Sequence, residues 1–275
     1  MNNALQVGTF NIRWANPDDG EHRWELRRER LFALLRSWRP DVLGLQEPLL
    51  PQLDALRQAL PNYDSVAVGR EDGVELGEFC PVFYRAVRFE RLDTGTFWFS
   101  ETPDVPGSLG WGSRHPRICT WVRLKDREST EAFYVYNVHW DHESQLAREN
   151  SARLLLGRIG SRAAADPVIV LGDFNAEADN PAVARLAAPD SPVPISALTP
   201  EQIRQSGTFH GFTGETSETP IDHILVSPEW TVTDAEVLRG DGLRPFPSDH
   251  FPLAATLQIA SASSGASASR ISTRA

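Results

Sequence analysis

Eight short apolar runs recur along the chain, and their spacing constrains the fold more than any other feature. Several are rich in Val, Ile, Phe and Tyr, which favour β-strands. Many are apolar at consecutive positions, so both faces of such strands must be covered. The pattern therefore predicts sheets packed on each other with helices outside. The predicted strands span residues 5–12, 41–47, 78–85, 117–124, 132–140, 167–175, 221–227 and 252–259.

Helical patterns lie between some of these runs. Apolar residues between 31 and 38 follow the i, i+3, i+4, i+7 spacing of one helix face, and a shorter stripe follows Pro51. Ser144 is a candidate cap for a third helix, and Asn180, which precedes a proline, for a fourth. We interpret the charged run at 23–30 as the solvated face of the first helix rather than a nucleic-acid patch.

Length and composition narrow the class of protein. The 275 residues suffice for one large core, and we expect one domain over 1–260 followed by a disordered, small and polar tail over 261–275. The chain lacks a secretory signal pattern and any apolar run of about 20 residues, so we expect a cytoplasmic protein with no membrane and no obligate protein partner. A net charge of −10 argues against a broad basic face for nucleic acid, although metal-binding acids would account for part of it.

Polar side chains stand where the predicted strands begin or end. Because side chains alternate along a strand, residues two apart share a face, which places His139 with Asp141 and Asp173 with Asn175. Carboxylate, amide and imidazole groups without thiolates suit Mg²⁺ or Mn²⁺ better than structural zinc. The sequence has no glycine-rich phosphate loop and no nucleophile elbow, so water is the expected nucleophile. The set comprises Asn11, Glu47, His139, Asp141, Asp173, Asn175, Asp222, Asp249 and His250.

Six short motifs, in a fixed order, carry a resemblance to a known family. They are "TFN", "LQE", "NVHWD", "GDFN", "IDHI" and "SDH", spread from residue 9 to residue 250. In this order the chain resembles the endonuclease/exonuclease/phosphatase superfamily, which has a deoxyribonuclease I-like fold. The superfamily also includes abasic endonucleases, deadenylases, inositol polyphosphate 5-phosphatases and neutral sphingomyelinases. Stretches such as "GTFWFSETPDVPG" and "TFHGFTGE" look like a bacterial branch distantly similar to the deadenylase-like members.

The resemblance implies a fold and a metal. The fold is an α/β four-layer sandwich, in which two mixed, mostly antiparallel sheets pack face to face between helices. The implied cofactor is Mg²⁺, with Mn²⁺ as a substitute, held mainly by Glu47 with help from Asn11 and Asp249. By the same likeness Asp173 orients or deprotonates the attacking water, and Asn175 hydrogen-bonds the phosphate.

Two histidines complete the catalytic set implied by the resemblance. His139 and His250 would contact phosphate oxygens and stabilise the charge of the transition state. We expect a carboxylate to hold each imidazole and favour its cationic form, Glu78 for His139 and Asp222 for His250. Glu75 competes with Glu78 for the first role, because the family pattern is loose there.

Other residues are candidates for substrate contact. Arg114 and Arg117 lie in a Trp- and Gly-rich stretch, and guanidinium groups suit bidentate phosphate binding, with a solvated loop or carboxylate pairing as the alternative. Asp141, the last residue of the "NVHWD" motif, is also predicted to contact the substrate. Four aromatic residues could stack on a base or sugar, although aromatic residues are more often part of a core. These are Trp98, Trp111, Phe209 and Phe212.

Three functions remain open at this point. The leading hypothesis is a metal-dependent phosphodiesterase or nuclease, in which water attacks in line a phosphate ester of a nucleotide or of nucleic acid, including single strands. The alternative is a phosphomonoesterase acting on a sugar or inositol phosphate, because the same core would serve and only the loops would differ. A catalytically silent binding module is disfavoured, because none of the six motifs has decayed.

Overall fold

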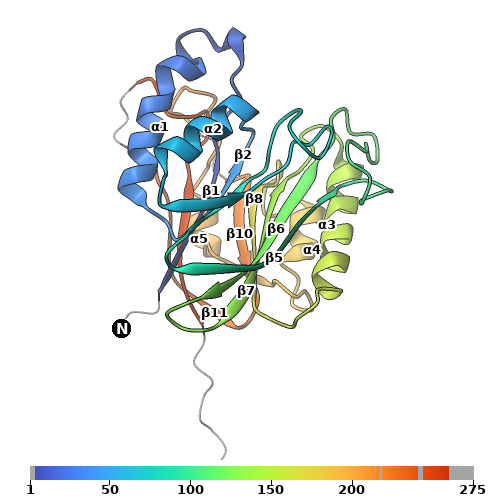
Figure 1. Ribbon diagram of the computed structural model, residues 1–275. Helices are drawn as coiled ribbons and strands as arrows, with labels where there is room; N and C mark the ends of the chain where they lie inside the picture. The colour runs from blue at the N-terminus through green and yellow to red at the C-terminus, as the bar shows by residue number, and fades with distance from the viewer. Residues whose placement is uncertain (1–3, 217–218, 241–243, 260–275) are drawn as a thin grey trace, which may run out of the picture.

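A computed structural model of the chain describes residues 4–216, 219–240 and 244–259 (Figure 1). Two six-stranded sheets pack face to face, and helices cover their outer faces, so the expected four-layer sandwich is confirmed. The tail predicted over 261–275 lies outside the described residues. Within the described part of the chain, no helix is both long and apolar enough to cross a membrane.

Each sheet has one parallel strand pair at its centre. In the first sheet β1 and β2 are parallel, in the second β7 and β8 are parallel, and the other neighbouring pairs are antiparallel. The first sheet has the order β11 (Trp230–Val237), β12 (Leu253–Ile259), β1 (Leu5–Asn11), β2 (Val42–Gln46), β4 (Val82–Arg85), β3 (Tyr63–Val66). The second has the order β5 (Phe89–Trp98), β6 (Ile118–Asp126), β7 (Ala132–His139), β8 (Val168–Asp173), β10 (Asp222–Val226), β9 (Ile195–Ser196).

Amphipathic helices bury their apolar stripes on the outer faces of both sheets. The first two helices pack on the first sheet, and α3 with α4 packs on the second (Figure 1). The predicted caps of α3 and α4 are confirmed, because the side chains of Ser144 and Asn180 accept backbone N–H groups. The helices are α1 (Trp24–Trp38), α2 (Leu50–Ala59), α3 (Gln145–Gly160), α4 (Pro181–Leu186), the short α5 (Pro200–Ile203) and the 3₁₀ turn η1 (Pro17–His22).

The space between the sheets changes from apolar to polar along the strands. On β7, Phe133 and Val135 belong to the inter-sheet core, and the next residues on the same face are polar, ending in His139. In the same way, the core-facing side of β1 changes from apolar residues to Asn11 at its end, and that of β8 changes to Asp173. Because the period of a strand is two, one register buries the core and brings these polar groups to one end of the sandwich.

Four strands, β3, β5, β9 and β11, are absent from the sequence prediction. All four lie at sheet edges. Their side chains are largely exposed or half-buried, so their sequences carry fewer apolar residues. Edge strands are recognised by the sheet they join rather than by their own composition.

Gly44 on β2 permits the two sheets to approach closely. A Cβ atom there would lie 2.1 Å from Leu171 Cδ1 and 2.7 Å from Asn137 Oδ1, both on the opposite sheet. We predict that Gly44→Ala lowers the free energy of unfolding by about 1–3 kcal/mol through overpacking, measured by urea denaturation. Gly157→Ala is the control, because Gly157 is on the exposed face of α3 and no described atom outside the backbone of its own helix lies within 4 Å of the added Cβ. It should stabilise by about 0.5–1 kcal/mol, and equal effects of the two changes would contradict the prediction.

Candidate active site

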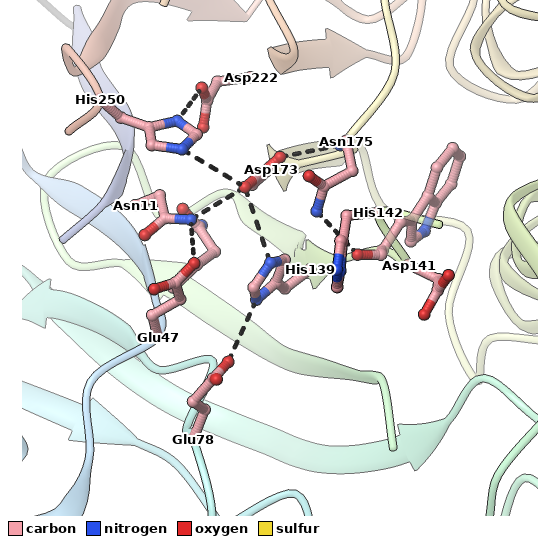
Figure 2. A network of polar contacts seen from close by, with 12 residues as sticks. Asn11, Glu47, Glu78, His139, Asp141, His142, Asp173, Asn175, Asp222 and His250 are labelled. Atoms are coloured by element: carbon pink, nitrogen blue, oxygen red, sulfur yellow. Dashed lines mark hydrogen bonds and ion pairs between the residues drawn. The ribbon is translucent and has the colours of Figure 1, made fainter. Parts of the chain in front are cut away.

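The carboxyl ends of the two parallel pairs bring four site residues together. Asn11 ends β1 and Glu47 follows β2, while His139 ends β7 beside Asp173 at the end of β8. The Asn11 amide joins the sheets, because its Nδ2 donates to Glu47 Oε1 and to Asp173 Oδ2, each at 2.9 Å. Four side chains from distant parts of the chain thus surround one point between the sheets (Figure 2).

Antiparallel neighbours contribute three further site residues, because these strands begin where the parallel strands end. Asp222 opens β10 opposite Asp173, and the Asp249-His250 pair precedes β12. His250 Nδ1 lies 2.8 Å from Asp222 Oδ2, and its Nε2 lies 3.9 Å from Asp173 Oδ2. Figure 2 shows Asp173 between the two histidines, with His139 Nε2 at 3.7 Å from its Oδ2.

One cavity of about 660 Å³ opens over these groups. Glu47 and Asp249, which lie about 200 residues apart in the chain, both line it, so the convergence that the sequence analysis expected is present. Asn11 and Asp222 lie behind the lining and contact the residues that form it. The predicted residues that line the cavity are Glu47, Glu78, Arg117, His139, Asp173, Asn175, Phe209, Asp249 and His250.

The environment of His250 favours its cation. Burial by itself lowers the pKa of this imidazole, but the charge of Asp222 and the hydrogen bond to it, with further contributions from Asp173 and Asp249, raise the pKa to about 10. His250 is therefore protonated at neutral pH, and its Nε2–H faces the cavity side of Asp173. The expected pairing of His250 with Asp222 is present.

His139 differs, and the expectation of a cationic imidazole is wrong for it. Glu78 lies 3.8 Å from His139 Nδ1, beyond hydrogen-bond distance. Burial lowers the pKa of His139 well below its ordinary value, and the nearby charges of Arg117 and Arg70 lower it further. Neutral His139 accepts a hydrogen bond at Nε2 from Arg117 Nη1 at 2.9 Å. The site therefore pairs one cationic histidine with one neutral histidine.

Three carboxyl groups at the site have raised pKa values, and of these Asp173 and Asp249 are buried and Glu78 is half-buried. Burial and the charge of Asp222 raise the pKa of Asp173 to about 7. Burial and the charge of Glu47 raise the pKa of Glu78 to about 7, and burial also raises the pKa of Asp249. Five carboxyl groups line the cavity and Asp222 lies behind it, whereas four cations are present, namely Arg13, Arg70, Arg117 and His250. A divalent cation bound among oxygen donors would relieve this repulsion, so the residues present fit such an ion.

Glu47 and Asp249 are the best-placed candidates for metal ligands. The oxygen of the Asn11 amide, which a metal would need, instead accepts the Arg13 backbone N–H at 3.0 Å. We therefore interpret Asn11 as orienting Glu47 and Asp173 rather than as a direct ligand. The potential donors of Asp173, Asp222 and His250 also lie within 4.8 Å of one another, but the protonated, Asp222-bound imidazole suits catalysis better than ligation.

Asn175 follows a sharp turn after β8. Its φ is 47°, and its backbone N–H donates to Asp173 Oδ1 at 2.8 Å. The side-chain amide donates to the Trp140 carbonyl at 2.9 Å, and the residue lines the cavity beside Asp173. The sequence pattern predicted that Asp173 and Asn175 lie on one face of a strand. In the structure β8 ends at Asp173, and a turn with left-handed backbone at Asn175 brings the two residues together.

The structure does not bring two predicted substrate contacts into the cavity. Asp141 lies after the end of β7, where its Oδ1 accepts the N–H groups of Glu143 and Ser144 and its Oδ2 lies 3.8 Å from Arg117 Nε. Arg114 is 74% exposed and lies 3.0 Å from Glu143 Oε2, as in the alternative of carboxylate pairing. Neither residue belongs to the cavity lining.

Other residues at the site were missed. His142 and Arg70 line the cavity, and Arg70 forms an ion pair with Glu78 at 2.5 Å. Arg27, read from sequence as part of a solvated run, is fully buried and donates to the carbonyls of Ile12, Arg13, Trp14, His22 and Pro247. Arg27 therefore holds the loop after β1 against the loop before Asp249. The sequence did contain a signal for this burial, because Arg27 lies three residues after Trp24 and four before Leu31, on the same buried face of α1.

A family profile described as "Endonuclease/Exonuclease/phosphatase family" matches residues 8–250 of the chain, which is most of its length. The chain belongs to the endonuclease/exonuclease/phosphatase family. It is thus a hydrolase of the type that acts on phosphate esters. The six motifs and the site residues from Asn11 to His250 fall inside the matched range.

Several solved structures of this family resemble the chain over nearly its whole length. A mannosyl-6-phosphatase of Bacteroides thetaiotaomicron is 33% identical, with a TM-score of 0.85 over 93% of this chain and 100% of that one. A family member from Bacteroides vulgatus is also 33% identical, with a TM-score of 0.87 over 94% and 99% of the two chains. The catalytic domain of human nocturnin is 20% identical with a TM-score of 0.74, over 94% of this chain and 96% of that one, a likeness of fold alone.

One viral protein is also similar. It is uncharacterized protein L388 of Acanthamoeba polyphaga mimivirus, 31% identical over 164 residues, or 57% of this chain. The match covers 60% of the length of the viral protein.

The ion pair between Asp222 and His250 can be tested by titration. In Asp222→Asn, burial dominates, so we predict that the pKa of His250 falls by about two units or more from about 10. Histidine NMR titration of the metal-free protein measures the change. Asp141→Asn removes a buried carboxylate that is neither hydrogen-bonded to nor ion-paired with His250 among the described residues, and it should leave the pKa of His250 unchanged. A His250 that still titrates near pH 10 in Asp222→Asn would refute the assignment.

Proposed function

We propose that the protein is a divalent-metal-dependent phosphatase that hydrolyses a small phosphate monoester, with a sugar phosphate as the substrate class. This is the alternative from the sequence analysis, preferred to a nuclease. The observation that carries it is the state of Arg117. The family resemblance, the cavity size and the full-length likeness to a mannosyl-6-phosphatase support it.

Arg117 is a buried cation whose side-chain hydrogen-bond partners are two histidines, and its ion-pair partner Asp141 lies beyond hydrogen-bond distance. It is 5% exposed, with Nη1 on His139 Nε2 at 2.9 Å and Nη2 on His142 Nδ1 at 2.8 Å. Its Nε has no hydrogen-bond partner among the described residues, and Asp141 Oδ2 lies 3.8 Å from it. A buried guanidinium without a bonded carboxylate is a strong site for an incoming anion. A phosphate monoester offers three terminal oxygens and nearly two charges, whereas a diester offers two oxygens and one charge.

The shape and charge of the molecule also favour a small substrate. A cavity of about 660 Å³ is typical of small-molecule sites. The net charge of −10 disfavours long polyanions, which need extended basic surfaces. Phe209 lines the cavity with 45% of its surface exposed, and its ring centroid lies 5.1 Å from that of His250. The exposed phenyl ring of Phe209 offers a flat apolar surface on which a sugar leaving group could stack.

The described side chains supply the steps of hydrolysis. Asp173, with a pKa near 7, can accept the proton of the attacking water at neutral pH. Cationic His250 and Arg117 then stabilise the negative charge that develops on the phosphate oxygens. Glu47 and Asp249 would hold the divalent ion, with Mg²⁺ favoured by the oxygen donors. When bound, this ion supplies Lewis-acid catalysis at the phosphate.

Removal of the proposed base should abolish turnover without harming the fold. We predict that Asp173→Asn lowers kcat by about 100-fold or more, because an amide cannot accept the water proton. Its melting temperature should equal or exceed that of the wild type, since a desolvated carboxylate is replaced by a neutral group. Glu75→Gln, an exposed carboxylate-to-amide change on the neighbouring loop, is the matched control. Near-normal turnover in Asp173→Asn would remove this assignment.

A substrate panel with Mg²⁺ or Mn²⁺ tests the function itself. We predict higher kcat/KM for hexose 6-phosphates than for bis-p-nitrophenyl phosphate, single-stranded RNA or DNA. Arg117→Gln should lower kcat/KM for monoesters by about 100-fold and for the diester by about tenfold or less, because the monoester uses more of its donors. Arg114→Gln, which removes an exposed guanidinium, should change neither. Preferred hydrolysis of nucleic acid would overturn the proposal and restore the nuclease hypothesis.

A further inference from the structure

Polar side chains, rather than apolar ones, fill the inter-sheet space directly beneath the catalytic groups. Thr9, Gln46 and Asn137 are each 0% exposed. Asn137 lies two residues before His139 on the same face of β7, Thr9 lies two residues before Asn11 on β1, and Gln46 directly precedes Glu47. The three residues belong to the sequence motifs, but the proposed chemistry gives them no role.

Hydrogen bonds of this layer connect the two sheets. Gln46 Nε2 in the first sheet donates to Asn137 Oδ1 in the second at 2.7 Å, and it also lies 3.1 Å from Thr9 Oγ1. Asn137 Nδ2 donates back to the first sheet, to the carbonyls of Leu45 and Pro81, each at 2.8 Å. Asn137 therefore contacts two positions of the opposite sheet besides Gln46.

The site depends on the position of one sheet relative to the other. Asn11 and Glu47 belong to the first sheet, whereas His139 and Asp173 belong to the second. The apolar core below holds the sheets together without directional preference, so it does not by itself fix how far one sheet slides over the other. Hydrogen bonds between buried amides are directional and short, so they do fix that position.

We propose that Gln46 and Asn137 are positioning residues that set the register between the two sheets and so hold Glu47 and Asn11 opposite His139 and Asp173. The expected effect on catalysis rests on the proposed function. The role of the two residues in setting the position of the sheets does not. The absence of a side chain at Gly44 supports this role of Asn137, because a Cβ at position 44 would lie only 2.7 Å from Asn137 Oδ1.

The Asn11 side chain provides a reporter that needs neither metal nor substrate. Its amide hydrogens bond Glu47 of one sheet and Asp173 of the other, each at 2.9 Å, so their exchange with solvent senses the inter-sheet register. Asn11 exchange is followed by NMR in the metal-free, full-length protein. Calorimetry with Mg²⁺ alone and kcat on hexose 6-phosphates complete the set of measurements.

The test compares volume-matched apolar replacements. The double variant Gln46→Met/Asn137→Leu removes both amides together, so neither is left unpaired, and the Thr9 hydroxyl loses its bonds to Gln46. We expect its melting temperature to stay within about 5 °C of the wild type, while Asn11 exchange accelerates at least about tenfold. The Kd for Mg²⁺ should rise about tenfold and kcat should fall about tenfold or more. Gln46→Met alone should give the same changes to a smaller extent, even if the double variant does not fold.

The matched control is Val135→Ala, two residues before Asn137 on the same face of β7 and equally buried. It should lower the melting temperature and leave Asn11 exchange, the Kd for Mg²⁺ and kcat near their wild-type values. Wild-type Asn11 exchange in Gln46→Met, or the same losses in Val135→Ala, would overturn the inference. A wild-type protein that hydrolyses no phosphate ester would instead refute the proposed function, and Asn11 exchange would still decide the register.

Discussion

The structure depends on two parallel strand pairs whose carboxyl ends face each other across the gap between the sheets. Parallel neighbours end at the same edge, so β1 with β2 and β7 with β8 each deliver two polar side chains to one place. Antiparallel neighbours begin there, which adds Asp222, Asp249 and His250. The Asn11 amide then joins the two halves, because it donates to a carboxylate from each sheet.

Two histidines in one pocket have opposite protonation states, and their immediate neighbours explain why. Both are buried, which disfavours charge. His250 has a carboxylate at 2.8 Å and keeps its proton, whereas His139 accepts from a guanidinium and stays neutral. The pocket is therefore divided into a carboxylate side around Glu47 and Asp249, suited to a cation, and a side around Arg117 suited to phosphate oxygens.

In the proposed function, substrate choice rests on residues outside the catalytic core. Arg117, His142 and Phe209 come from loops and strand ends beside the core, and under this proposal they would together favour a compact, doubly charged phosphate attached to a ring. The fold alone does not distinguish such a substrate from nucleic acid. The distinction depends on where cations and exposed rings lie, and both lie inside a cavity of small-molecule size.

The sequence alone determined the sandwich, its central strands, two helix caps and most of the polar residues that gather at one end of the sandwich, because these follow from local periodicity and from six motifs in order. Tertiary structure decided the rest. The edge strands β3, β5, β9 and β11 form because a neighbouring sheet offers hydrogen-bond partners, not because their own sequences are apolar. The neutrality of His139, the burial of Arg27 and the turning of Asp141 towards backbone amides depend on residues that are distant in sequence or lie beyond a strand end. Local pattern reports which way a side chain points along a strand or helix, whereas charge state and bonding partners depend on what the folded chain places around it.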